Sequence, residues 1–293
     1  MIKRISVLVA TLACVSLNAM ETGGRKEHVI TGNPVDFLEP HYGRAEQLFA
    51  RMDLSQFPVI TEVGVMTGFV AKNILAKQAP KSEITAIVRA DSPFAGHLEG
   101  DKGSGVNFKK QDIRNVTLEK PTNLLIFLGQ LPYENNKKGF IENLAKNIAP
   151  NGLLVTTCVT PNNSSLIKAF LEVKEDPRWK SDLDKIDINK IWMPAPREEI
   201  EDILNNAGLA VKKVELDESP VIFKNRETFK LFVSAVTSGI KARISDSQTL
   251  NNKEQLDTYL ETLTQTYLKY HPAREDGTVE YHIPEHIFVA RKN

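Results

Sequence analysis

Three residues in one apolar stretch of this sequence could position a ligand. Glu62, Gly64 and Gly68 lie in the segment 58–68, where an apolar strand is predicted to run into a turn. Apolar side chains then recur at helical spacing over residues 69–77, which predicts a helix. Glycine lets a backbone approach a ligand closely, and the start of a helix offers unpaired N–H groups. This order can form a dinucleotide or nucleoside pocket, although a packing turn without a ligand would use glycine in the same way.

The elements that must hold this turn alternate between strand and helix. Continuously apolar segments such as 124–128 are typical of strands that are buried on both faces of a parallel sheet. Further strands are predicted at 84–88, 106–109, 153–159, 209–216 and 286–292, and helices at 46–54, 141–148, 196–207 and 254–270. The sequence therefore predicts a doubly wound, mostly parallel α/β sheet, with one long helix inserted before the last strand.

The N-terminus has the pattern of a secretory signal peptide. Lys3 and Arg4 precede an apolar run over residues 5–17, and Ala19 is a small residue where a signal peptidase would cut. We expect residues 1–19 to be removed, the chain to be exported to a periplasmic or secreted location, and no membrane span to remain. A buried core helix, an uncleaved anchor and a lipoprotein processed at Cys14 are the alternatives.

Charge, cysteine content and histidine spacing do not indicate a nucleic-acid partner, a disulfide or a metal site. The chain has 37 basic and 37 acidic residues, so its net charge does not predict a nucleic acid or an anionic membrane as a partner. Cleavage after residue 19 would leave Cys158 as the single cysteine, without an internal disulfide. His282 and His286 have a spacing that suits a metal on a helix, but Pro284 lies between them, so no metal site is expected. No serine or cysteine nucleophile can be assigned, and the catalytic residues are unknown.

Several segments together resemble one family, the class I S-adenosylmethionine-dependent methyltransferases. Residues 62–68 resemble its acidic, glycine-rich turn, and 111–113 resemble the segment after its third strand. Residues 147–154 are similar to the turn before its fifth strand, 198–209 to a helix that ends in Ala-Gly, and 286–292 to its closing strand. The resemblance extends from about Tyr42 to the C-terminus. It implies a Rossmann-like, seven-stranded domain over residues 45–293, preceded by an N-terminal arm at 20–44.

The resemblance also implies a cofactor, S-adenosylmethionine, and the residues that bind it. Gly64 and Gly68 would lie against its methionine part and ribose, and Glu62 would hold the turn or meet the amino end of the cofactor through water. Asp112 would accept a hydrogen bond from the adenine amino group, with the backbone of Ile113 beside it. Within the family, residues 276–279 and the inserted helix are weakly similar to the small-acid, trans-aconitate type of methyltransferase.

Three ligand-facing positions differ from the family pattern. Met66 replaces the middle glycine of the turn, Val88 stands where an acid usually binds both ribose hydroxyls, and Asn123 replaces an acid at the start of the fourth strand. Two hypotheses follow. The chain is a methyltransferase for a small-molecule or protein acceptor, or it is an exported, catalytically silent domain that acts as a binding or interaction module.

Overall fold

The computed structural model describes residues 34–65, 67–89, 98, 103–161, 164–188, 192–243 and 252–293, with the side chains of 34–41 and 235–243 left aside. The predicted signal peptide and Met66 lie outside the described residues. The chain forms two compact units. We call His41–Asn162, Met193–Ser219 and Pro284–Asn293 the sheet unit, and Met1–Pro40, Asn163–Trp192 and Pro220–Ile283 the helical unit. The predicted domain bounds at 20, 45 and 293 stay a prediction.

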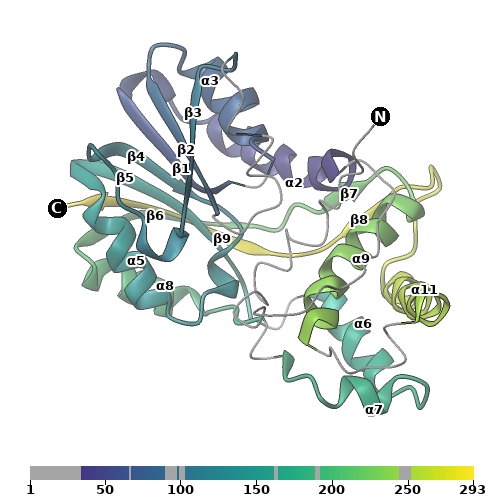
Figure 1. The fold of residues 1–293 in the computed structure, drawn as a ribbon. Helices are drawn as coiled ribbons and strands as arrows, with labels where there is room; N and C mark the ends of the chain where they lie inside the picture. The colour runs from purple at the N-terminus through teal and green to yellow at the C-terminus, as the bar shows by residue number, and fades with distance from the viewer. Residues whose placement is uncertain are drawn as a thin grey trace. The chain divides into compact units, whose positions relative to one another are not determined.

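A seven-stranded sheet forms the centre of the sheet unit (Figure 1). Its strands are β1 Val59–Val65, β2 Glu83–Arg89, β3 Val106–Gln111, β4 Thr122–Phe127, β5 Ile148–Val159, β6 Leu209–Asp217 and β9 Glu285–Lys292. They are ordered β3-β2-β1-β4-β5-β9-β6, and β9 runs antiparallel to both of its neighbours. Strands β1 to β5 pair in parallel. The predicted α/β class, the seven strands and the mostly parallel pairing are confirmed.

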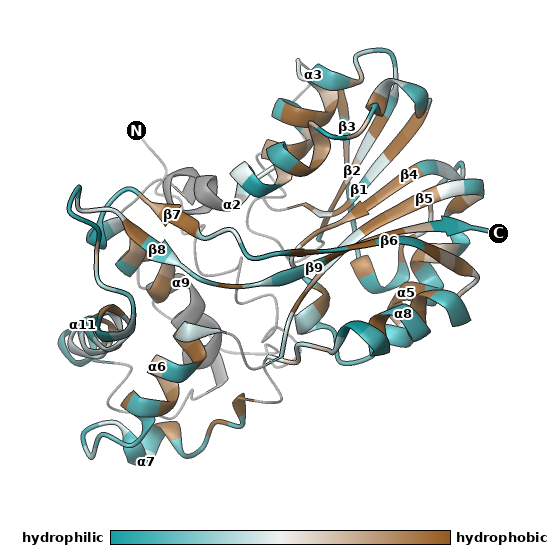
Figure 2. Cartoon of the chain, turned by 180° about the vertical axis from the view of Figure 1, so that it is seen from behind, coloured by the Kyte–Doolittle hydropathy of each residue, from teal (hydrophilic) through white to brown (hydrophobic). Residues whose placement is uncertain are grey.

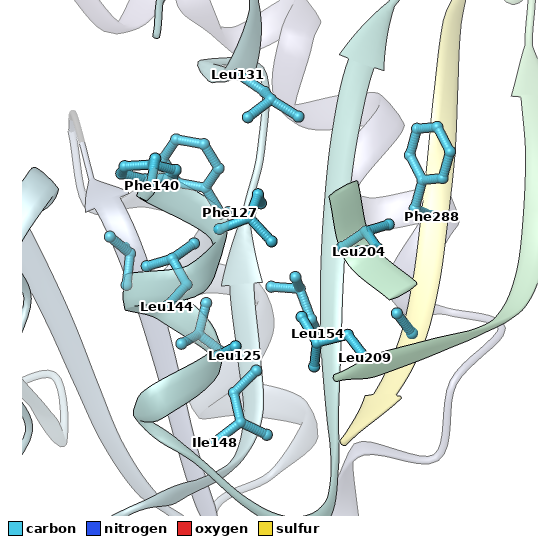
Figure 3. Close-up of a cluster of buried hydrophobic side chains, with 14 of the residues drawn as sticks. Leu125, Phe127, Leu131, Phe140, Leu144, Ile148, Leu154, Leu204, Leu209 and Phe288 are labelled. Atoms are coloured by element: carbon cyan, nitrogen blue, oxygen red, sulfur yellow. The ribbon is translucent and has the colours of Figure 1, made fainter. Parts of the chain in front are cut away.

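Apolar side chains explain why these segments form the interior of the sheet. In Figure 2 the central strands β1, β4 and β5 are largely brown, whereas α5 (Lys137–Lys146) and α8 (Arg197–Asn206) carry much teal as well as brown. Leu125 and Phe127 of β4 are fully buried. They meet Phe140 and Leu144 of α5 in one core cluster, to which Leu204 of α8 also belongs (Figure 3). Burying each such side chain contributes about 1.5–3 kcal/mol, so α5 and α8 fix the position of β4 and the loop that follows it.

Two helices near the glycine turn differ from their predicted bounds. The helix expected at 46–54 is α2, which spans Pro34–Phe49. Proline suits the first turn of a helix, and Asp53 caps the separate 3₁₀ helix η2 (Leu54–Gln56) by accepting a hydrogen bond from the N–H of Ser55 at 3.1 Å. The helix expected at 69–77 is a π-helix, η3 (Val70–Leu75), continued by α3 (Ala76–Gln78).

The helical unit contains elements that the sequence patterns above do not predict. These are α6 Ser165–Lys174, α7 Lys180–Leu183, α9 Arg226–Arg243 and the antiparallel pair β7 Val221–Phe223 and β8 Val279–Tyr281. The predicted long helix is present as α11 Lys253–Tyr270. Tyr259 and Tyr267 of α11 are fully buried and belong to the core of the helical unit. Trp179 is also buried and packs edge-on against Tyr259, with ring centroids 5.6 Å apart.

Candidate cofactor site

The turn after β1 has the backbone that its glycines allow. Gly64 and Gly68 adopt φ angles of +79° and +75°, in the left-handed region where a side chain is unfavourable. Gly68 leads into the π-helix η3, in which the N–H of Ala76 bonds the carbonyl of Ala71, five residues earlier. Such π-helical turns are rare and occur often at functional sites. The structure thus confirms a strand, a glycine turn and a helix start in this order.

Glu62 of β1 carries a carboxylate with an unsatisfied oxygen. Its Oε2 atom is buried and has no hydrogen-bond partner among the described residues. Burial raises the pKa of Glu62 to about 8, against the lowering effect of the backbone N–H of Ala71. A buried carboxylate without its full set of partners is unfavourable. The site therefore holds a group that a cationic or hydrogen-bond-donating ligand would satisfy.

Tyr42 of α2 covers this turn. Its hydroxyl hydrogen-bonds the hydroxyl of Thr67, and its ring stacks on Phe69 with 4.4 Å between centroids and 7° between planes. Burial raises the pKa of Tyr42, and the nearby charge of Glu62 raises it further. Tyr42 therefore lies beside both the turn and the carboxylate of Glu62.

The loop after β4 forms the second wall of the site. The side-chain amide of Gln130 donates a hydrogen bond to the carbonyl of Gly64. A Cβ added to Gly64 would lie 2.7 Å from Nε2 of Gln130, which real Cβ atoms do not tolerate. Glycine at this position therefore permits contact between two loops at the carboxyl edge of the sheet, where ligands bind in open α/β folds.

The space beside Gly68 is filled by side chains. A Cβ added there would lie 3.0 Å from Cδ2 of Leu98 and 3.1 Å from the ring of Phe108. Lys72 extends over the same ring, with its Nζ 5.2 Å from the centroid. Gly68 is thus needed for packing in this structure, and this supports the hypothesis of a binding module in which the turn serves the fold.

Asp112 follows β3, at the position expected for an adenine-binding residue. Its exposed carboxylate accepts hydrogen bonds from the N–H of Arg114 at 3.0 Å and from the amide of Asn115 at 3.1 Å. Each carboxylate oxygen can accept a second bond, so Asp112 can still receive an adenine amino group. Ile113 is buried in the core cluster, which fixes the backbone beside Asp112.

The end of β2 consists of Val88 and Arg89 and carries no acidic side chain. Val88 is fully buried and pairs with Val65 of β1 and Lys110 of β3. The next residue, Arg89, is 7% exposed. Sequence reasoning missed a carboxylate close by, because Glu134 comes from the loop after β4 and no motif marks it. Glu134 lies within electrostatic range of Arg89 and Asp112.

Taken together, the predicted residues Glu62 and Gly64 lie at the end of β1 and Gly68 in the turn that follows, and Asp112 with Ile113 lies at the carboxyl edge two strands away. The unsatisfied oxygen of Glu62 and the free acceptor capacity of Asp112 fit the amino end and the adenine of S-adenosylmethionine. Val88 does not fit its ribose. Gln130 and Glu134 are the polar neighbours that sequence reasoning did not include.

His271 belongs to a separate cluster in the helical unit. Its Nε2 lies 2.6 Å from Oγ of Ser165, and its ring stacks on His282 at 4.7 Å. His282 Nε2 in turn lies 3.2 Å from a carboxylate oxygen of Glu280. No group of three or more metal-ligating side chains is found in the part of the chain that the structure describes. Within that same part, no helix is both long and apolar enough to cross a membrane.

Comparison with known protein sequences gives one partial match. No model of a known protein family matches the chain. A stretch of 124 residues is 29% identical to a malonyl-[acyl-carrier protein] O-methyltransferase from Bacillus cereus, covering 42% of this chain and 46% of that protein. The chain thus spans less than half the length of the curated relative that it matches.

Solved structures show the same fold at low sequence identity. Magnesium protoporphyrin IX methyltransferase from Synechocystis PCC 6803, solved with bound SAH, has a TM-score of 0.52 at 13% identity, over 93% of this chain and 90% of that one. The [4+2]-cyclase SpnF has a TM-score of 0.51 at 16% identity, over 98% and 93%. With the sheet order and the glycine turn, these similarities show that the chain has the fold of the class I S-adenosylmethionine-dependent methyltransferases.

Proposed function

We propose that this protein binds S-adenosylmethionine and transfers its methyl group to a small-molecule or protein acceptor. The observation that carries the proposal is the buried, unpartnered Oε2 of Glu62 beneath the turn from Gly64 to Gly68. The methyltransferase relatives support it, one of them having been solved with SAH. The fold alone does not fix the reaction, because a cyclase shares it.

In the proposed reaction the residues of this chain bind the cofactor and align it with the methyl acceptor. The cofactor would supply a methyl group on a positively charged sulfur, which is already an activated donor. Glu62 would bind the cationic amino end, Asp112 would accept from the adenine, and Tyr42 would cover the turn and exclude water. Holding donor and acceptor in line is the main contribution that such a site makes to the rate.

Calorimetric titration of the full chain with S-adenosylmethionine and with S-adenosylhomocysteine tests the proposal. We expect dissociation constants in the micromolar range, or about −8 kcal/mol, and weaker binding to the Asp112→Ala variant. The matched control is Asp53→Ala, because Asp53 also caps a 3₁₀ helix but at the start of η2, before β1. Absence of heat and of a thermal shift at millimolar ligand would contradict the proposal.

That negative result would favour the second candidate function, a methyltransferase-fold module that binds a partner. The packing of Leu98 and Phe108 at Gly68 and the apolar Val88 are the observations that favour it. Titration with the cofactor therefore distinguishes a methyltransferase from a partner-binding module before any partner is known.

We further propose that the protein is exported, to a periplasmic or secreted location. The proposal is based on the basic start, the apolar run and the small residue at 19. Cell fractionation with mass spectrometry of the mature N-terminus tests it. A mature chain that begins near Met20 is expected, and a full-length chain in the cytoplasm would contradict export.

A further inference from the structure

Glu134 is a mostly buried carboxylate with spare hydrogen-bonding capacity at the carboxyl edge of the sheet. It ends the short 3₁₀ helix η5 (Leu131–Tyr133) and is 8% exposed. Its one ion pair among the described residues is long, with 4.0 Å between Oε2 and Nε of Arg114. No described residue donates a hydrogen bond to its carboxylate. Buried acidic groups normally have such partners, so Glu134 is placed as a binding group would be.

The neighbours of Glu134 locate it within the candidate cofactor site. Arg89 follows Val88 directly, at the end of β2, and Asp112 follows β3; both act on Glu134 electrostatically. Gln130, four residues before Glu134, contacts the carbonyl of Gly64. The loop after β4 therefore carries Glu134 to the carboxyl edge of the sheet, within electrostatic range of the end of β2, where Val88 stands in place of a ribose-binding acid.

Hydrogen bonds that a ligand donates would favour the ionised form of Glu134, which burial by itself disfavours. Burial raises its pKa and Asp112 raises it further, whereas Arg114, Arg89 and Lys137 lower it. Two hydroxyl groups on adjacent carbons could each donate a hydrogen bond to the two oxygens of one carboxylate. Such bonds to an ionised acceptor are stronger than bonds between neutral groups.

We infer that Glu134, supplied by the loop after β4, binds the ribose hydroxyls of the cofactor in place of the acid that β2 lacks. This inference rests on the proposed function, because it names a residue for the same ligand. It explains how a site with Val88 on β2 can still bind a nucleoside. It also predicts that specificity for ribose comes from a loop whose position depends on the core cluster to which Phe140 and Leu131 belong.

Titration with S-adenosylhomocysteine and its 2′,3′-dideoxy analogue tests the inference. We expect the unmodified chain to prefer the ribose form by about 10- to 100-fold, the range for hydrogen bonds to a charged group. Glu134→Gln and Glu134→Ala should bind the two ligands with nearly equal affinity. Glu119→Gln is the matched control, because Glu119 is an exposed carboxylate whose partner is Lys109, at 2.5 Å.

The outcomes separate this inference from the proposed function. Failure of the unmodified chain to bind S-adenosylhomocysteine would overturn both. Binding with an unchanged preference for ribose in the folded Glu134 variants would overturn the inference alone. Thermal melts of each variant establish that it is folded, and Glu134→Asp, which keeps the charge, should retain part of the preference if the inference is correct.

Discussion

The ring of Tyr42 lies flat on the ring of Phe69, with centroids 4.4 Å apart, and so joins helix α2 to the glycine turn. The two residues are 27 positions apart in the chain, and one lies on each side of β1. Their contact is an offset or parallel stack of the kind that aromatic pairs favour. Because Thr67 shares a hydrogen bond with the same tyrosine, the turn is held from the N-terminal side by both apolar and polar contact.

Removing the two parts of this contact should have different costs. Tyr42→Phe keeps the stack and loses the bond to Thr67, so we expect about 1 kcal/mol of destabilisation. Tyr42→Ala also loses the buried ring and should cost about 3 kcal/mol or more. Urea unfolding measures both. Tyr270→Phe is the control, since Tyr270 is 50% exposed and its bond to Glu172 should matter less. Equal losses for Tyr42→Phe and Tyr270→Phe would argue against the Thr67 contact.

Glu62 should make the stability of the protein decrease with rising pH. Its pKa is about 8 in the folded chain and 4.5 in the reference state. The folded form therefore holds the proton more tightly, so the stability that Glu62 contributes is fully present below pH 4.5 and is lost between pH 4.5 and 8, by at most about 1.4 kcal/mol per unit. Glu62→Gln should flatten this part of the pH profile of the free energy of unfolding. Glu218→Gln, at an exposed carboxylate, should leave it unchanged; identical profiles for both variants would contradict the assignment.

Gly68 should tolerate alanine less well than other glycines with the same backbone. Gly68→Ala combines an unfavourable φ of +75° with crowding by Leu98 and Phe108. Gly105→Ala has a similar φ of +71° and open space around its Cβ. Backbone strain alone should cost about 1–2 kcal/mol in Gly105→Ala, and Gly68→Ala should cost measurably more by chemical denaturation. Equal costs would mean that Leu98 and Phe108 move aside, and that the turn can open for a ligand.

The His271 cluster should weaken as the pH falls. Burial, and then the neighbouring His282, lower the pKa of His271, while Glu280 raises it and Lys168 lowers it. The unfolded chain thus binds the proton more readily, and the stability contributed by neutral His271 is lost as the pH falls below about 6.5. The protection of α6 and α11 amides from hydrogen exchange, taken relative to the intrinsic exchange rate at each pH, should decrease from pH 7.5 to 5.5.

Ser165→Ala provides the comparison for this pH effect. It removes the 2.6 Å partner of His271 but leaves the stacked histidine ring in place. We expect a lower stability at pH 7.5 and a similar decrease towards pH 5.5. If the protection of α6 amides, taken relative to the intrinsic exchange rate at each pH, is the same at pH 7.5 and 5.5 in the unmodified chain, the histidine pair has no such role.

Local sequence patterns were sufficient to determine the class of the fold. The continuously apolar segment at β4 and the helix-ending Gly208 state where strands and helices lie, because burial and backbone geometry act within a few residues. The glycines at 64 and 68 likewise predict a turn between strand and helix, and both adopt positive φ in the structure. The π-helical start of η3 and the extension of α2 to Pro34 were missed, since tertiary contacts such as Tyr42 with Phe69 override local periodicity.

The tertiary structure alone decided which polar groups meet. Glu134 and Gln130 carry no motif, and they join Gly64 and Asp112 only because parallel strands bring their carboxyl ends to one edge of the sheet. Ser165 and His271 are 106 residues apart and become neighbours through the packing of α6 and α11. The sequence by itself determined the strands, the turn and the acidic residues near it. Packing decided their partners and burial, because these depend on contacts between distant parts of the chain.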